Sequence, residues 1–162
     1  MSLKLSKRLK EIVDMCEPCD TIIDVGTDHG KVAIEIANKN IAKTVLAVDN
    51  KKGPLEMCKK NVCMYMHSET VDFKILLSDG IKDLNKEVLS GIIIAGMGYD
   101  SIKSILSDIQ NYNFKYIILS PHTKITELIE FLNDKNIEVV EQKAVLECKK
   151  NYIIMKAKKK EA

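Results

Sequence analysis

The chain has 162 residues, a length typical of one domain with its own core. Its apolar fraction of 46% and charged fraction of 30% are ordinary for a globular protein and exclude disordered and membrane-embedded classes. No apolar run reaches the ~20 residues of a membrane span, and the Lys–Leu alternation at the N-terminus is unlike a signal peptide. We therefore expect a cytoplasmic protein that does not bind membranes.

The first half of the sequence alternates predicted helices with buried strands. Apolar spacing predicts an N-terminal helix over about residues 5–16. An apolar, β-branched run predicts a strand over Thr21–Val25, followed by a glycine-containing loop and a helix over about Lys31–Asn38. Thr44–Val48 is a second predicted strand. Gly53-Pro54 then opens another helix, because proline fits the first helical turn.

The second half continues this alternation and closes with a pair of strands. Three apolar segments are predicted strands: Val71–Leu77, Gly91–Ala95 and Tyr116–Leu119. Their almost wholly apolar composition is typical of parallel strands covered on both faces. Helical spacing predicts helices over 102–109 and 125–132. Ile137–Leu146 and Tyr152–Ala157 flank a short Lys149-Lys150-Asn151 turn, which predicts an antiparallel hairpin.

Strand–helix alternation that ends in an antiparallel hairpin is distinctive among doubly wound sheets. Dinucleotide dehydrogenases usually finish with parallel strands, whereas the predicted order is similar to class I S-adenosylmethionine-dependent methyltransferases. We therefore predict a Rossmann-like α/β fold, with a seven-stranded, mainly parallel sheet, a C-terminal antiparallel hairpin and helices on both faces. Residues 1–162 are expected to form a single domain.

The loop after the first strand indicates the kind of cofactor. Asp24, Gly26, Asp28 and Gly30 form the pattern D-x-G-x-D-x-G. Asp28 stands where a dinucleotide-binding loop has its second glycine, and its carboxylate would repel a pyrophosphate. This pattern favours S-adenosylmethionine, which is cationic and lacks phosphate, over NAD. Asp28 also fits a helix-capping role, and both roles can coexist.

Residues after the other strands are expected to converge with this loop, because ligands bind at the carboxyl ends of parallel strands. Asp49 follows Gly26 at the ~20-residue distance of an acid that binds a cofactor ribose. Asp79 is predicted to bind the adenine amino group, although a turn Asp-Gly explains it equally well. The full predicted cofactor-binding set is Asp24, Gly26, Asp28, Asp49, Asn50, Ser78, Asp79, Gly80, Ala95 and Gly96.

Five cysteines form no disulfide framework. Cys16 and Cys19 are a lone C-x-x-C, which could be half a zinc site or a redox pair. A zinc site would also need Cys58 and Cys63, at a spacing that is not a familiar one. We interpret these cysteines as reduced thiols and expect no metal.

Several of these motifs resemble the bacterial tRNA (adenine-22)-N1-methyltransferase family (TrmK type). The matching segments are Leu5–Leu9, Asp24–His29, Gly53-Pro54, Ser78–Gly80, Ile94–Gly98 and Glu147–Met155. The resemblance implies an enzyme that uses S-adenosylmethionine to methylate N1 of an adenine in tRNA. It places cofactor binding on Asp24, Gly26, Asp49, Asp79 and Gly96, and places Asp28, His29 and Met97 toward the substrate.

The sequence departs from the family pattern in three places. Family members carry a second, helical C-terminal domain, whereas we expect this chain to be the catalytic domain alone. Ser120-Pro121-His122 replaces Gln-Pro-Asn, and Tyr99 replaces the last glycine of Gly-Met-Gly-Gly. The predicted catalytic residues are Asp28, His29, Met97 and His122. The predicted substrate-binding residues are Lys7, Arg8, Gly98, Tyr99 and Pro121.

The expected chemistry is direct in-line methyl transfer to a flipped-out base, because adenine N1 has a free lone pair once it is unpaired. Lysines near the N-terminus, together with Arg8, could contact tRNA phosphates. Two alternatives remain open: a protein that binds S-adenosylmethionine with lost or changed activity, and a small-molecule methyltransferase. The sequence indicates no oligomeric state beyond a monomer or a weak dimer.

Overall fold

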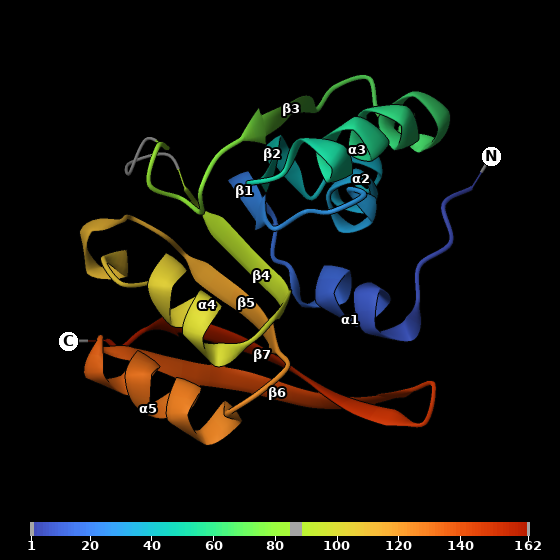
Figure 1. Cartoon of the computed structure of the whole chain (residues 1–162). Helices are drawn as coiled ribbons and strands as arrows, with labels where there is room; N and C mark the ends of the chain where they lie inside the picture. Colours follow the sequence, from blue (N-terminus) through green and yellow to red (C-terminus); the bar gives the residue numbers. More distant parts are fainter. Residues whose placement is uncertain (1, 85–88, 162) are drawn as a thin grey trace.

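The computed structural model describes residues 2–84 and 89–161 and contains one mixed β-sheet (Figure 1). Its seven strands lie in the order β3-β2-β1-β4-β5-β7-β6. The strands are β1 (Cys19–Val25), β2 (Ala42–Asp49), β3 (Asp72–Leu77), β4 (Gly91–Met97), β5 (Tyr116–Pro121), β6 (Ile137–Glu147) and β7 (Lys150–Lys159). Strands β1 to β5 pair in parallel, and β7 is antiparallel to both β5 and β6. The predicted fold class is confirmed.

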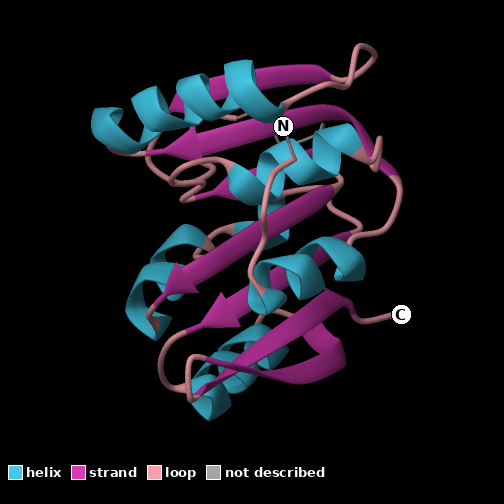
Figure 2. Ribbon diagram, turned by 90° about the vertical axis from the view of Figure 1, so that its right-hand side faces the viewer, coloured by secondary structure: helices cyan, strands magenta, loops and turns pink. Residues whose placement is uncertain are grey.

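Helices cover both faces of this sheet (Figure 2). They are α1 (Lys7–Met15), α2 (Lys31–Asn38), α3 (Lys52–Tyr65), α4 (Tyr99–Ile105), the short 3-10 helix η1 (Ile109–Asn111) and α5 (Ile125–Asp134). Helices α1, α2 and α3 contribute to one hydrophobic core, and α4, η1 and α5 to the other.

Consecutive residues of the central strands alternate between these two cores. In β4, Ile93 packs with the α1 side whereas Ile92 and Ile94 pack with the α4 side. In β5, Ile118 and Leu119 divide in the same way. Side chains of a strand point alternately to opposite faces, so a strand covered on both faces needs apolar residues at every position. This requirement explains the continuous apolar runs in the sequence.

Some element boundaries differ from the predicted ones. Helix α1 begins at Lys7 because the Ser6 hydroxyl accepts a hydrogen bond from the Leu9 N–H at 3.3 Å, as an N-cap. Helix α4 begins at Tyr99 and ends at Ile105, where 102–109 was predicted, and η1 follows it.

The hairpin turn was predicted one residue too late. Cys148 and Lys149 have φ values of 50° and 62°, so both central residues are left-handed, and β7 already begins at Lys150. A two-residue turn of this kind matches the twist of the two strands that it joins, and it usually contains Asn or Gly. Neither residue is present here, so the turn could not be located from residue type.

The carboxyl ends of the parallel strands lie at one edge of the sheet, where the loops after β1, β2, β3 and β4 meet. Within residues 2–84 and 89–161, no helix is long and apolar enough to span a membrane.

Candidate active site

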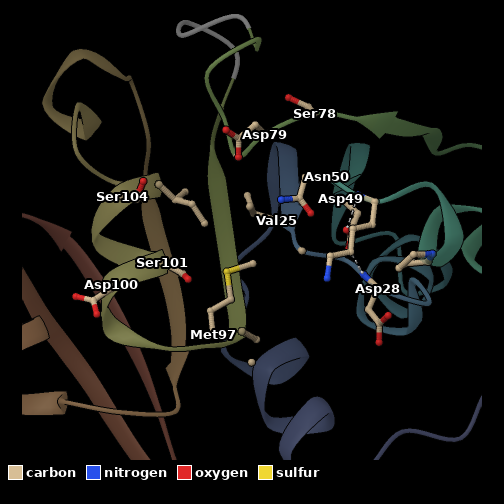
Figure 3. Close-up of a pocket in the computed structure, with 17 residues that line it drawn as sticks. Val25, Asp28, Asp49, Asn50, Ser78, Asp79, Met97, Asp100, Ser101 and Ser104 are labelled. Carbon is tan, nitrogen blue, oxygen red and sulfur yellow. Dashed lines mark hydrogen bonds between the residues drawn. The ribbon is translucent and has the colours of Figure 1, made fainter.

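A cavity of about 600 Å³ opens at the carboxyl ends of β1 to β4 (Figure 3). Each of the four loops contributes to its wall, and α4 closes one side. Nine of the ten predicted cofactor-binding residues line it: Gly26, Asp28, Asp49, Asn50, Ser78, Asp79, Gly80, Ala95 and Gly96. The tenth, Asp24, lies in an adjoining cavity. The structure therefore brings together residues from four separate strand ends.

Gly26 allows the first loop to approach β4 closely. Its φ of 71° is left-handed, which favours glycine. A Cβ atom at this position would also overlap the Cε atom of Met97. The Met97 side chain lies between β4 and the β1 loop in the middle of the cavity (Figure 3). Glycine is therefore favoured at residue 26, where another residue would be strained and would require the Met97 side chain to move.

Asp49 fixes the loops after β1 and β2 to each other. One carboxylate oxygen accepts the backbone N–H of Asp28 and the other accepts that of Lys51, both at 3.1 Å. Asp49 is only 9% exposed, and the two hydrogen bonds fix the orientation of its carboxylate. Each carboxylate oxygen has more than one acceptor position, which leaves capacity for hydroxyl donors from the cavity.

Asp24 is a buried carboxylate, and its surroundings disfavour the ionised form. The Thr27 hydroxyl donates a hydrogen bond to it at 2.8 Å. Burial is the main reason that the pKa of Asp24 rises from 3.8 to about 7, and the nearby Asp49 and Asp28 carboxylates add to this rise. A cation beside Asp24 would stabilise its ionised form.

A second cavity of about 440 Å³ lies on the other side of the glycine loop, against α1. It shares Gly26, Asp28, Ala95 and Gly96 with the first cavity, so the two are neighbours around one loop. Its other lining residues are Arg8, Leu9, Asp24, Thr27, His29, Lys31, Val32 and His122.

Three of the four predicted catalytic residues line the second cavity, and Met97 lines the first. Asp28 and His29 are exposed, with 3.7 Å between the His29 Nε2 and a carboxylate oxygen of Asp28. The Asp28 carboxylate points away from Asp49 and Met97 (Figure 3). His122 lies near Gly96, since a Cβ atom there would be 3.8 Å from its Nε2. These polar groups could act on a ligand at the border of the two cavities.

Of the predicted substrate-binding residues, only Arg8 lines either cavity within the described part of the chain. Lys7 is exposed on α1, and Gly98 is the N-cap residue of α4. The Tyr99 ring packs against the α4-side core, and Pro121 is buried at the end of β5. These four residues therefore lie near the site without facing the cavities.

Several lining residues were missed by the sequence prediction. Asp100, Ser101 and Ser104 on α4 line the first cavity, as do Lys51 and Pro54 near the start of α3. The α4 residues directly follow the predicted Ala95–Gly98 motif. If the helix had been predicted to begin at residue 99, its serines would have been expected to line the site. Thr27 could also have been recognised, because it lies three residues after Asp24 in the same tight loop.

The cysteine pair lies at the opposite end of β1 from this site. The Tyr116 hydroxyl donates to the Glu17 carbonyl at 2.9 Å and lies 3.7 Å from the Cys19 sulfur. Burial raises the pKa of Cys16 to about 12, which keeps this thiol protonated. All five cysteines are free, and the residues described here contain no cluster of three or more metal-ligating side chains.

The sheet order, the closing hairpin and the acidic glycine loop define a Rossmann-like methyltransferase. The protein family described as "Methyltransferase domain" matches residues 5–155, and the chain belongs to this family. No curated protein sequence matches the chain.

Solved structures give more specific similarities. M. capricolum TrmK, solved with S-adenosyl-homocysteine, is 26% identical with a TM-score of 0.84, over 96% of this chain and 69% of that chain. A Streptococcus pneumoniae protein assigned as a candidate tRNA (m1A22) methyltransferase is 26% identical with a TM-score of 0.85, over 98% of this chain and 72% of that one. A Streptococcus agalactiae protein of the NADB-Rossmann superfamily has a TM-score of 0.87 at 26% identity, over 100% and 72% of the two chains.

Proposed function

We propose that this protein is an S-adenosylmethionine-dependent methyltransferase that methylates N1 of an adenine in tRNA, as an adenine-22 type enzyme. The observation that carries the proposal is the loop around Gly26, where the acids Asp24, Asp28 and Asp49 border two joined cavities. M. capricolum TrmK and the Streptococcus pneumoniae protein, which match almost the whole of this chain, support the same activity.

The residues present fit S-adenosylmethionine better than a dinucleotide. Three carboxylates border the loop, and a pyrophosphate would be repelled by them. S-adenosylmethionine has no phosphate and carries a net positive charge, so these carboxylates attract it. Asp49 would hold the ribose hydroxyls, and Asp79 with its neighbours Ser78 and Gly80 would hold the adenine.

S-adenosylmethionine supplies an electrophilic methyl group on a sulfonium. The protein's main task is positioning, because an unpaired adenine N1 is nucleophilic without a general base. Met97 and Gly96 would shape the place where the base meets the methyl group. Asp28, His29 and His122 would stabilise the positive charge that develops on the methylated ring. We also propose that residues 1–162 form a single domain and act in the cytoplasm, where the proposed substrate is processed.

Incubation of the purified chain with an unmodified tRNA transcript and methyl-labelled S-adenosylmethionine tests this function. We expect label at N1 of one adenine, and loss of labelling when that adenine is replaced by guanine. Asp49→Asn should reduce labelling and cofactor binding together. Cofactor binding without tRNA labelling would instead identify a binding protein, and labelling of a small metabolite would identify a different methyltransferase.

A further inference from the structure

Two exposed lysines, Lys103 and Lys124, gather around one tyrosine ring where α4 and α5 begin. The Lys103 ammonium lies 5.7 Å from the centre of the Tyr99 ring, and the Lys124 ammonium lies 5.9 Å from it. Tyr99 and Lys103 are on α4, whereas Lys124 is the N-cap residue of α5. Two positive charges from separate helices, here called the lysine pair, are therefore held beside one aromatic face.

Hydrogen bonds fix the loops after β4 and β5 to each other. The Thr123 hydroxyl accepts the backbone N–H of Tyr99 at 3.1 Å. The backbone N–H of His122 donates to the Met97 carbonyl at 2.9 Å. Helices α4 and α5 also pack beside each other in the same core (Figure 1). The position of the lysine pair is therefore set by the fold.

Both loops start from residues that line the candidate site. Met97 lines the first cavity and lies two residues before Tyr99. His122 lines the second cavity and lies two residues before Lys124. The lysine pair lines neither cavity. It therefore lies at the rim of the site, outside the place where the base would meet the methyl group.

Contacts within the protein do not account for these two charges. Among residues 2–84 and 89–161, neither ammonium group of the lysine pair forms an ion pair or donates a hydrogen bond. Lys135 is different: its ammonium lies 5.8 Å from the centre of the Phe131 ring but also donates to the Ser107 carbonyl at 2.7 Å. The lysine pair is thus free to bind an anion from outside.

Lys124 also has a backbone conformation that its residue type disfavours. Its φ of 52° and ψ of 53° are left-handed, and its side chain makes no capping hydrogen bond to α5. Glycine or asparagine is favoured in this conformation, and Ser, Thr, Asp or Asn is favoured as an N-cap. Strained residues of this kind cluster at binding sites, where the side chain has a use that offsets the backbone cost.

We propose that the lysine pair binds the phosphate backbone beside the target adenine. This inference rests on the proposed function and adds to it the place where the RNA strand crosses the rim of the site. A base extruded from a tRNA helix stays attached to its own phosphates, which remain outside the pocket that takes the base. Two ammonium groups meet such anions as point charges and position the strand without reading its sequence.

Binding of an unmodified tRNA transcript, measured by filter retention from about 0.05 to 0.3 M KCl, tests the assignment. Each phosphate contact contributes about 0.7–0.9 to the slope of log affinity against log salt. Lys103→Gln combined with Lys124→Gln should therefore reduce this slope by roughly 1.5 and weaken binding roughly 15- to 30-fold at about 0.15 M salt. The dissociation constant of S-adenosylmethionine, measured by calorimetry, should not change, because the lysine pair lines neither cavity.

Lys124→Gly separates a loss of binding from damage to the fold. It removes one cation and relieves the left-handed backbone, so the melting temperature should stay equal or rise. Its tRNA binding should nevertheless weaken roughly four- to sixfold at about 0.15 M salt. Lys115→Gln is the matched control, because this exposed lysine precedes β5 at the opposite edge of the sheet. Its tRNA affinity and salt slope should match those of the wild type.

A double variant with the wild-type tRNA affinity and salt slope would overturn the role of the lysine pair but leave the proposed function intact. An equal loss of binding in Lys115→Gln would also overturn it, because the effect would then come from net charge alone. A wild-type chain that binds S-adenosylmethionine but neither binds nor labels tRNA would overturn the proposed function, and this inference with it.

Discussion

Asp24 combines burial with a charge that the proposed cofactor needs. Its pKa is raised from 3.8 to about 7 mainly by burial. At pH values between these two pKa values, Asp24 keeps a proton in the folded chain that it has already released in the unfolded chain. The contribution of Asp24 to the free energy of unfolding of the ligand-free protein therefore falls as pH rises from about 4 to 7, and it is constant above 7.

Cofactor binding should show the opposite pH dependence. The cationic ligand favours ionised Asp24, so the dissociation constant should rise by up to about tenfold per pH unit below pH 7. Asp24→Asn should bind more weakly and lose this dependence. The measurement is calorimetric titration with S-adenosylmethionine from pH 5.5 to 8. Asp20→Asn, at an exposed position of β1, should behave as wild type, and a wild-type affinity independent of pH would contradict the prediction.

A side chain at Gly26 should destabilise the protein and weaken cofactor binding. Gly26→Ala places a Cβ atom against the Met97 methyl group in a left-handed conformation. We expect a loss of about 1–3 kcal/mol in the free energy of unfolding and much weaker cofactor binding, measured by urea denaturation and calorimetry. Adding Met97→Ala should recover part of the stability, because it relieves the contact but not the backbone strain.

Gly53→Ala is the control for this prediction. Gly53 lies in the first turn of α3, and apart from its chain neighbours and the helix's own backbone nothing lies within 4 Å of an added Cβ atom; its φ is not left-handed. Alanine should change the free energy of unfolding by less than about 1 kcal/mol, because its better helix propensity is opposed by the steric restriction of a residue before proline. If Gly26→Ala were equally harmless, the proposed need for glycine in the cofactor loop would be wrong.

At the scale of elements, the β6–β7 hairpin connects the edge of the sheet to α1. Lys143 on β6 forms an ion pair with Glu11 on α1 at 2.7 Å, in addition to the contacts of Arg8 with Glu147 and Tyr152. The tip of the hairpin lies beside α1 (Figure 1). The antiparallel ending of the sheet therefore also supports the helix that borders the second cavity.

Two substitutions in the hairpin turn should stabilise the protein without changing the site. Cys148 and Lys149 adopt left-handed conformations that cost roughly 1–2 kcal/mol per ordinary residue. Cys148→Asn combined with Lys149→Gly should raise the free energy of unfolding by about 1 kcal/mol or more, measured by urea denaturation. Cofactor affinity should not change, and a destabilised double variant would show that the turn has a different conformation.

At the scale of the whole molecule, one ligand would join the loops after four strands of the central sheet. Binding only to the folded chain should raise its stability by about 2.7 kcal/mol at a ligand concentration 100 times the dissociation constant. A thermal melt with and without S-adenosylmethionine measures this effect. Asp79→Ala should reduce the ligand-induced rise but leave the melting temperature of the free protein unchanged, because Asp79 is exposed. An unchanged wild-type melting temperature would contradict cofactor binding.

Much of the fold was predictable because its determinants are local. The central strands are continuous apolar runs, and the glycines and prolines mark where strands end and helices begin. These boundaries also predict where the cofactor-binding residues lie, because every residue directly after a parallel strand is at the same edge of the sheet. For this reason the sequence predicts that Asp49 and Asp79, which are 30 residues apart in the chain, lie in one site, and both line the first cavity.

The direction of individual side chains was less predictable. Lys7 and Arg8 are neighbours with similar charge, yet only Arg8 is turned toward the second cavity. Tyr99 was expected to face the substrate, but its ring packs against the α4-side core. Rotation about a helix and packing by distant elements decide such orientations, and neither can be read from residue type.

The sequence by itself determined the sheet, its antiparallel ending and the acidic loop, because strand periodicity and turn residues act over a few neighbours. Only the tertiary structure showed that Asp24 and Arg8 border one cavity and that both are withdrawn from water. Arg8 is on α1 and Asp24 is on β1, and the packing of α1 against the sheet and the hairpin brings the two residues to the same cavity. Desolvation and charge pairing depend on that packing, so the chemistry of the second cavity arises only in the folded chain.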